Sequence, residues 1–207
     1  ADFNQAIKFR PDDAYAFRCR SVAWSGKGKS YKAFVDLTRS IQLNPNRVMP
    51  HYLRGNISLD RGDNDSAIAD YSRVIKIKES WVMAYYDRGI AWERSGYYDK
   101  AIDDYNRVVE LSADDAQLYV NRGVAWKAKQ EYDKALDDCV LALAKHSEFS
   151  AVFDLRGAVH FEREKFAEAA VALDRYVALA PERPAGALWR YIARTRAGQA
   201  QAGKELA

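Results

Sequence analysis

The chain carries one pattern twice in close succession, as YYDRGIAWERSGYYDKAIDDYNRVVEL at residues 85–111 and as YVNRGVAWKAKQEYDKALDDCVLAL at residues 119–143. The second copy starts 34 residues after the first. The same offset recurs at a column of small residues: Ser21, Gly55, Gly89, Gly123 and Gly157. Twelve positions later each unit has an alanine, and sixteen positions later a bulky or apolar residue: Leu37, Tyr71, Tyr105, Cys139 and Leu173. A fixed period of this length predicts a repeat architecture.

Within one period the apolar residues have helical spacing. In the unit at 82–115 they precede and then follow the dipeptide Ser95-Gly96, at steps of three and four. Each unit is therefore predicted to be two helices joined by a short turn. Small residues such as Gly89 and Ala101 let the paired helices approach closely, while aromatic side chains fill the space beside them. One such hairpin cannot bury both faces, so neighbouring units are expected to stack.

This pattern closely resembles the tetratricopeptide repeat family. The positions that match its aromatic, glycine and small-residue places are Tyr85, Gly89, Trp92, Tyr98, Ala101 and Tyr105, and the closing-proline place holds Pro11, Pro45 and Pro181. The resemblance implies an all-α, right-handed superhelical solenoid of stacked helix-turn-helix units. The style of the repeats also resembles that of bacterial members of the family.

The period divides the chain into seven segments. Residues 1–13 match the last turns of a second helix whose partner is missing, which suggests a piece of a longer array. Five whole units are expected at 14–47, 48–81, 82–115, 116–149 and 150–183. Residues 184–198 look like one more first helix, and residues 199–207 like a weak second helix, so that 184–207 form a C-terminal capping region.

The tripeptide Gly28-Lys29-Ser30 resembles the end of a nucleotide-binding loop. Such a loop needs another glycine five residues earlier, where its backbone N–H groups wrap the phosphates. Ala23 stands there, and the residues before it are not strand-like. The tripeptide occupies the same place in its repeat as residues 93–98 do in theirs. We therefore interpret it as the turn between two paired helices.

The net charge, the cysteine spacing and the length of the apolar runs limit the kinds of function that this chain can have. The 32 basic and 29 acidic residues leave a net charge of +3, too balanced to favour nucleic acid as the main partner. Cys19 and Cys139 are far apart and lack metal-ligand spacing, so both are expected to be reduced. No apolar run approaches the ~18 residues of a membrane span. We expect a cytoplasmic protein by default, and a location in the cell envelope is the alternative.

No enzymatic, metal or cofactor site emerges from the motifs. The acidic stretch 60–70 has Asp65 and Tyr71 where a calcium loop needs Gly and Glu. Adjacent aspartates such as Asp103 and Asp104 point about 100° apart on a helix, so they cannot act as a facing pair. The three histidines are expected to serve packing rather than catalysis: His51, His146 and His160. The sequence predicts a non-catalytic protein without cofactor or metal.

An arginine recurs directly before the small-residue column, at Arg20, Arg54, Arg88, Arg122 and Arg156. A packed stem with a paired guanidinium explains such a column better than a ligand site. We hypothesise that these arginines pair with second-helix aspartates: Asp36, Asp70, Asp104 and Asp138. The fifth unit has Ala172 at that place, so the series should break there.

The resemblance also implies a concave groove, lined by the first helices, that receives a peptide or a partner helix. The partner-binding positions carried over to this chain are Tyr15, Arg18, Met49, Tyr52, Asn56, Met83, Tyr86, Asp87, Ile90, Gln117, Val120, Asn121 and Val124. The same places also include Cys19, Val22, Leu53, Asp154, Leu155 and Ala158. Exposed apolar residues there would mark an interaction site. The alternative is that some of them only pack against neighbouring helices.

Some family members clamp the C-terminal carboxylate of chaperones with Lys, Asn and Arg on successive first helices. The matching places here hold residues such as Val22, Leu53 and Asp87, which do not form that clamp. An apolar or mixed peptide, or a helix of another protein, is the expected partner. Two alternatives stay open: self-association through the terminal helices, and a regulatory or targeting domain of a larger protein with an enzymatic part elsewhere.

Overall fold

The computed structural model describes residues 3–111 and 115–198. These residues form twelve helices and no strand, so the fold class is all-α, as predicted. The helices are α1 (Phe3–Phe9), α2 (Ala14–Ser25), α3 (Ser30–Leu43), α4 (Val48–Asp60), α5 (Asn64–Ile77), α6 (Val82–Arg94), α7 (Tyr98–Leu111), α8 (Ala116–Ala128), α9 (Tyr132–Lys145), α10 (Ser150–Glu162), α11 (Phe166–Leu179) and α12 (Pro184–Arg196). Each of the five expected repeat ranges contains one pair of helices.

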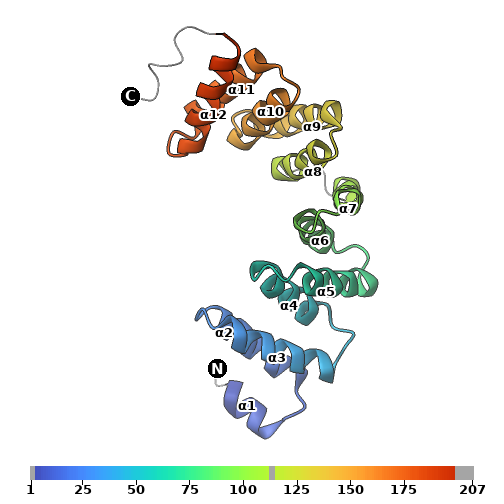
Figure 1. Ribbon diagram of the computed structural model, residues 1–207. Coiled ribbons are helices and arrows are strands. Elements are labelled where there is room, and N and C mark those ends of the chain that lie inside the picture. Colours follow the sequence, from blue (N-terminus) through green and yellow to red (C-terminus); the bar gives the residue numbers. More distant parts are fainter. Residues whose placement is uncertain (1–2, 112–114, 199–207) are drawn as a thin grey trace. The chain divides into compact units, whose positions relative to one another are not determined.

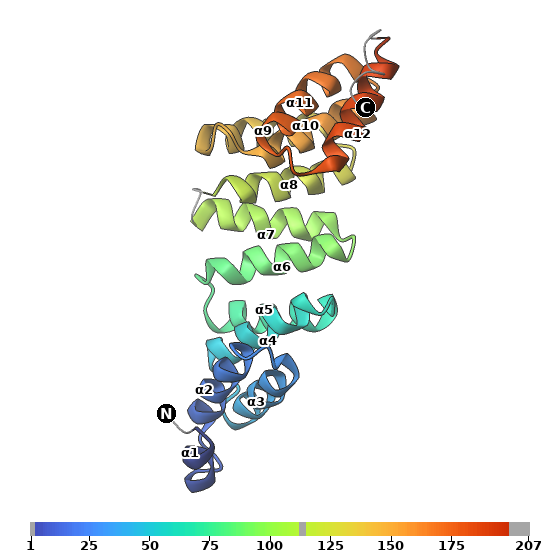
Figure 2. The same ribbon diagram turned by 90° about the vertical axis from the view of Figure 1, so that its left-hand side faces the viewer.

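The chain divides into two compact units, residues 1–111 and residues 112–207. In the first unit, α2, α4 and α6 run along one side and their partners α3, α5 and α7 along the other (Figure 1). Figure 2 turns the side of the first helices toward the viewer. Each first helix contacts its own second helix, and α3 and α5 contact the first helix of the next pair. The second unit stacks α8 to α12 by the same rule.

The turn inside each hairpin needs one residue in the left-handed region. The residues with positive φ recur at the repeat period: Gly28, Gly62, Gly96, Gln130, Glu164 and Gly198. Glycine reaches this conformation without a Cβ penalty, whereas other L-residues are strained there. Gly28 has φ 68°, and Ser30 already begins α3. The stretch around Gly28 is therefore the predicted interhelical turn.

Close approach between the paired helices depends on the small-residue column. A Cβ added at Gly89 would lie 2.6 Å from Cε1 of Tyr105, whose ring is fully buried. Gly55 faces Tyr71 at 2.8 Å and Gly157 faces Leu173 at 2.7 Å in the same way. A large second-helix side chain thus lies where the first helix has no side chain. This packing confirms the predicted role of Gly55, Gly89 and Gly157, whereas a Cβ at Gly123 would meet Cδ2 of Leu155 on α10, at 2.7 Å.

Four of the five arginines in the predicted column pair with the predicted aspartates. Arg88 donates from Nε and Nη2 to the two carboxylate oxygens of Asp104, at 2.8 and 2.7 Å. Its Nη1 donates to Ser72 of the preceding second helix, at 2.9 Å. The same bidentate pair joins Arg20 to Asp36, Arg54 to Asp70 and Arg122 to Asp138. We call each of these pairs a rung.

The rungs are not electrostatically equivalent. Burial raises the pKa of Asp104 and of Asp138, and the paired arginine only partly offsets it. Burial also acts on Asp70, but hydrogen bonds from His51 and Arg54 outweigh it and lower the pKa of this carboxyl. His51 is buried, with Nδ1 3.1 Å from Asp70 and Nε2 3.0 Å from the carbonyl oxygen of Pro45. This histidine packs in the core, as predicted.

The terminal helices follow the repeat pattern. α1 contacts α2, and its Asn4 accepts a hydrogen bond from Arg20 Nη1 at 3.0 Å, as Ser72 does from Arg88. α1 therefore makes the contacts of a second helix. α12 packs on α11. The weak helix expected at 199–207 lies outside the described residues.

The substitution Gly89→Ala should lower stability, because the new methyl group would overlap the buried ring of Tyr105. Overpacking costs about 1–3 kcal/mol, whereas the gain in helix propensity is about 1 kcal/mol. Urea unfolding followed by circular dichroism measures the difference. Gly26→Ala is the control, since Gly26 has φ −64° and its added Cβ meets nothing closer than 3.6 Å. Equal stability of the two variants would contradict the close-packing account.

The substitutions Gln130→Gly and Glu164→Gly should raise stability. Both residues have positive φ, at 62° and 58°, in a place where other turns have glycine. Relief of this strain, less the entropy of the freer unfolded chain, is worth about 0.5–1 kcal/mol for each substitution. The rise in melting temperature measures it. Lys129→Gly, at φ −85°, should lower the melting temperature instead, and a rise there would point to a cause other than backbone strain.

Candidate functional site

One column of side chains on the first helices is both apolar and exposed. Tyr15, Met49 and Met83 occupy the same place in three successive repeats and are 63%, 37% and 52% exposed. The fourth repeat has Gln117 at this place, so the hairpin does not require an apolar residue there. Apolar side chains that the fold does not bury are typical of an interaction surface. We call the side of the first compact unit formed by α2, α4 and α6 the first-helix surface.

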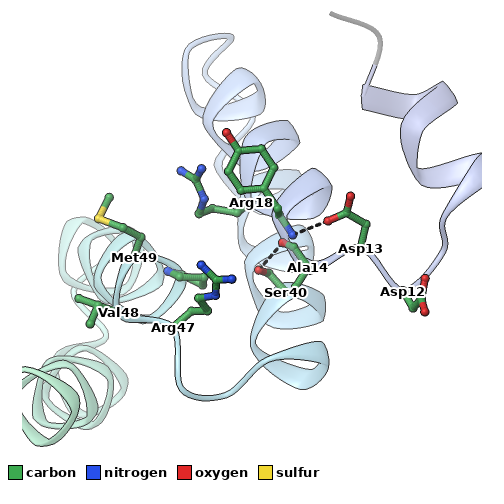
Figure 3. A pocket seen from close by; sticks show the side chains of 10 residues that line it. Asp12, Asp13, Ala14, Arg18, Ser40, Arg47, Val48 and Met49 are labelled. Atoms are coloured by element: carbon green, nitrogen blue, oxygen red, sulfur yellow. Dashed lines mark hydrogen bonds between the residues drawn. The ribbon is translucent and has the colours of Figure 1, made fainter.

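A pocket of about 520 Å³ opens on this surface between α2 and α4. Figure 3 shows Arg18, from α2, and Met49, from α4, on facing sides of the pocket. Arg18 lies over the ring of Tyr15, with 4.6 Å from Cζ to the ring centroid. Arg47, just before α4, adds a second guanidinium to the lining. The pocket therefore combines two cations with apolar walls.

Carboxylates also line the pocket, but one of them is already engaged. Asp13 caps α2 by accepting hydrogen bonds from the backbone N–H groups of Tyr15 and Ala16, at 2.9 and 3.1 Å. Ser40 is likewise engaged, because its hydroxyl donates to the carbonyl oxygen of Ala14 at 2.7 Å. These bonds hold the floor of the pocket in place. The side chains left to meet a ligand are the two arginines, the carboxylate of Asp12 and the apolar groups.

Tyr52 and Asn56 are tied into the packing of the surface. The hydroxyl of Tyr52 donates to Oδ2 of Asp87 at 2.7 Å, and its ring lies 5.8 Å from that of Trp81 between centroids. Asn56 accepts a hydrogen bond of 2.9 Å from the hydroxyl of Tyr71. Both residues are half-buried. They shape the surface, and they offer a ligand less free area than the exposed column does.

The far end of the first-helix surface is acidic. Burial raises the pKa of Asp87, against the hydrogen bond from Tyr52 that lowers it. Burial likewise raises the pKa of Glu93, which accepts a hydrogen bond of 3.0 Å from Tyr105. Within residues 3–111 and 115–198, no basic group lies within 4.0 Å of Asp87. A cation from outside would stabilise this carboxylate. Nearby, Tyr86 and Ile90 are half-buried.

The predicted positions on α8 have different surroundings. Val120 is only 5% exposed, so it is not available to a ligand. Gln117 donates from Nε2 to Oδ1 of Asn121 at 2.7 Å, and Val124 is half-buried. A pocket of about 340 Å³ opens farther along, lined by Asp154, Gly157, Ala158, Phe161, Glu162, Leu173 and Trp189.

Neither Arg47 nor the contact between Phe161 and Trp189 was found from the sequence. Arg47 precedes a first helix, at a place where other repeats have Trp81 or Asp115, so no column marks it. Phe161 meets Trp189 edge to face, with centroids 5.4 Å apart, and together they form one wall of the second pocket. Their separation in sequence hides this pair. The helical spacing of Phe161 on α10 and of Trp189 on α12 is the only sequence signal for this pair, and Arg47 has none.

The remaining candidates take structural places. Among the described residues, no three His, Cys, Asp or Glu side chains gather so that they could hold a metal ion. Asp104 is buried in a rung while Asp103 is exposed, so adjacent aspartates do not face each other. His146 departs from the expected packing role: it is exposed, with its ring 5.6 Å from that of Phe149. None of the described helices is long and apolar enough to cross a membrane.

The repeats of this chain match a known protein family. The model of the tetratricopeptide repeat family matches the chain at residues 52–116 and again at residues 86–151. These ranges include the two similar stretches at residues 85–111 and 119–143. A comparison with curated proteins finds no match.

Solved structures of repeat proteins resemble the chain over most of its length. YrrB, described as a tetratricopeptide repeat protein with an unusual peptide-binding site, aligns with TM-score 0.80 and 16% identity over 94% of this chain and 98% of its own. A tetratricopeptide repeat protein from Parabacteroides merdae aligns with TM-score 0.80 and 17% identity over 93% and 77%. MamA from Desulfovibrio magneticus aligns with TM-score 0.77 and 20% identity over 82% and 96%. At these identities the likeness shows the fold alone.

The two cysteines should differ sharply in reactivity toward Ellman's reagent. Both are free thiols, but Cys139 is buried, and burial raises the pKa of its thiol to about 12. Cys19 is partly exposed beside Arg18, whose Nη2 lies 3.6 Å from Sγ. At pH 8 the native chain should therefore release one equivalent of thionitrobenzoate, and the chain in denaturant two. Cys19→Ser should abolish the native reaction, and two rapid equivalents from the native protein would contradict the burial of Cys139.

Proposed function

This chain is a tetratricopeptide repeat protein, and from that premise we propose that it is a non-catalytic scaffold that binds a segment of another protein on the first-helix surface. The family's fold suggests a protein-interaction scaffold in general. The finer proposal, that an extended peptide or a helix of the partner lies across α2, α4 and α6, rests on the side chains of this chain.

The observation that carries the proposal is the exposed column of Tyr15, Met49 and Met83. Leaving three large apolar side chains in water in consecutive repeats loses the stabilisation that burial would bring, about 25 cal/mol per Å². Tyr anchors and adaptable Met side chains are common in protein interfaces. A bound segment would cover all three at once, because the repeat period places them in one row.

Charge gives the bound segment a preferred direction. Arg18 and Arg47 line the pocket at one end of the row, and Asp87 lacks a basic partner among the described residues at the other. A segment with an acidic residue toward α2 and a basic residue toward α6 would be complementary to both ends. The apolar residues between them would contact the exposed column. This is a mixed ligand rather than an acidic chaperone tail.

Removal of the apolar column should weaken capture of the partner. The variant Tyr15→Ser/Met49→Ser/Met83→Ser changes exposed side chains, so it should keep the helical content and melting temperature of the wild type. Loss of three contacts of about 1 kcal/mol each should lower the affinity by at least tenfold. A pull-down from source-organism lysate identifies the retained protein, and titration with the purified partner measures the affinity.

The matched control removes apolar area from the second-helix side of the same unit. Tyr31→Ser/Val35→Ser changes two exposed residues of α3 and should retain the partner. Equal recovery by wild type and both variants would contradict the first-helix surface as the binding site. Recovery of only the chain itself would favour self-association, and turnover by a recovered full-length protein would favour a regulatory domain of an enzyme. The substitution Tyr52→Glu would not test the first-helix surface alone, because it would also remove the hydrogen bond from Tyr52 to Asp87.

A further inference from the structure

The fifth rung of the arginine series is incomplete on both sides. Arg156 holds the arginine place, but the aspartate place is occupied by Ala172, which is buried at 5% exposure. The place that supplies Ser72 to Arg88, or Thr38 to Arg54, is occupied by Val140. Within the described residues no carboxylate lies within 4.0 Å of the Arg156 guanidinium, and it donates no hydrogen bond. The cation is present and both of its usual acceptors are replaced by apolar side chains.

A pocket of about 530 Å³ opens at this incomplete rung. Its lining consists of Phe153, Arg156, His160, Ala167, Glu168, Val171, Ala172 and Arg175. The first repeat has an equivalent pocket of about 590 Å³, built from the corresponding places of α2 and α3. There Arg20 is already bound by Asp36, at 2.7 Å for both hydrogen bonds. The hollow is thus common to two repeats, but the arginine of the rung column has a carboxylate partner in the first repeat and none in the described part of the fifth.

We propose that this pocket binds the carboxylate of an Asp or Glu side chain of a partner protein, which completes the fifth rung from outside. A guanidinium fork matches a carboxylate in two parallel hydrogen bonds, the geometry that the other four rungs show. The volume that Asp138 fills beside Arg122 is left open beside Arg156 by the shorter Ala172. The partner's carboxylate would take that place.

The other walls of the pocket favour a protein side chain over a small free anion. The exposed Val171 gives apolar surface beside the cation, and Arg175 lies over the ring of the buried Phe153, with Cζ 5.8 Å from the centroid. Residues that flank an acidic side chain in a protein could cover this surface. Glu168 is the one acidic member of the lining, and it makes no ion pair with Arg156 within 4.0 Å. His160 adds a buried Nδ1 that has no hydrogen-bond partner in the described chain.

The site shares no residue with the proposed first-helix surface of α2, α4 and α6, because its lining belongs to α10 and α11. Arg156 and His160 lie on one face of α10, whereas Ala158 and Phe161 lie on the other and line the pocket beside Trp189. The two pockets of this compact unit share no lining residue. A partner could therefore be held at either site alone, and failure of one proposal does not remove the other.

Binding is tested on the full chain by NMR of the arginine Nε–H groups. The probe is N-acetyl-aspartyl-leucinamide, and its amide counterpart N-acetyl-asparaginyl-leucinamide is the control ligand. The signal lost in Arg156→Gln assigns the resonance. We expect a saturable shift of this signal with the acidic dipeptide, a shift at least tenfold smaller with the amide, and none in Ala172→Asp, where an internal carboxylate occupies the site. Absence of a saturable shift, or an unchanged shift in Ala172→Asp, would overturn the proposal.

Two further titrations separate the sources of the anion. Sodium acetate should bind more weakly than the acidic dipeptide, because it cannot cover the exposed Val171. Equal affinity for acetate would assign the site to small carboxylates and overturn the protein side chain as occupant. Inorganic phosphate should not compete with the dipeptide at equal concentration. Tighter binding of phosphate would make the pocket a general anion site and overturn the carboxylate assignment.

The stability of the unliganded chain gives a second, independent measurement. Ala172→Asp places a carboxylate in the vacant rung and should leave the melting temperature unchanged or raise it. Ala170→Asp, on the same helix and 2% exposed, lies outside the lining of this pocket and should lower it markedly. If Ala172→Asp lowers the melting temperature as much as Ala170→Asp does, the site does not accept a carboxylate. In that case the proposal fails even if the first-helix surface binds its partner.

Discussion

The close contact between a first helix and one large side chain of its partner helix is the constraint on which this structure depends. Gly89 leaves room for the ring of Tyr105, and Gly55 does the same for Tyr71. Because a Cβ would overlap these rings, the helix separation, the small-residue column and the buried aromatic place are linked. The 34-residue period follows from repeating this contact, since each hairpin has to present the same faces to its neighbours.

The rungs add a polar constraint to this packing. Each arginine joins its own second helix and, where Ser72 or Thr38 accepts a bond, the preceding second helix as well. A buried ion pair of this kind contributes little net stability, because desolvation offsets most of the attraction. It does make the arrangement specific, because an unpaired buried carboxylate would be costly. The fifth rung has the arginine but lacks the aspartate, so a carboxylate from outside would complete it.

The proposed function depends on the places that the hairpin leaves unconstrained. The column of Tyr15, Met49 and Met83 is exposed, and Gln117 shows that the fold accepts a polar residue there. Val120, from the next column of the first helices, is instead buried. Family resemblance treats both columns as surface for a partner. The actual exposure separates a contact surface from side chains that only fill the space between helices.

The period, the helical hairpins, the interhelical turns and four arginine–aspartate pairs could all be predicted from the sequence alone. Each is a local or strictly periodic feature, so it leaves a column that one chain displays several times. Only the tertiary structure decided that Tyr52 is held by Asp87, that Val120 is buried, and that Arg47 lines a pocket. These outcomes depend on how side chains from different repeats pack against one another. The packing of a residue depends on all of its neighbours in the fold, and a column in the sequence does not show which residues these are.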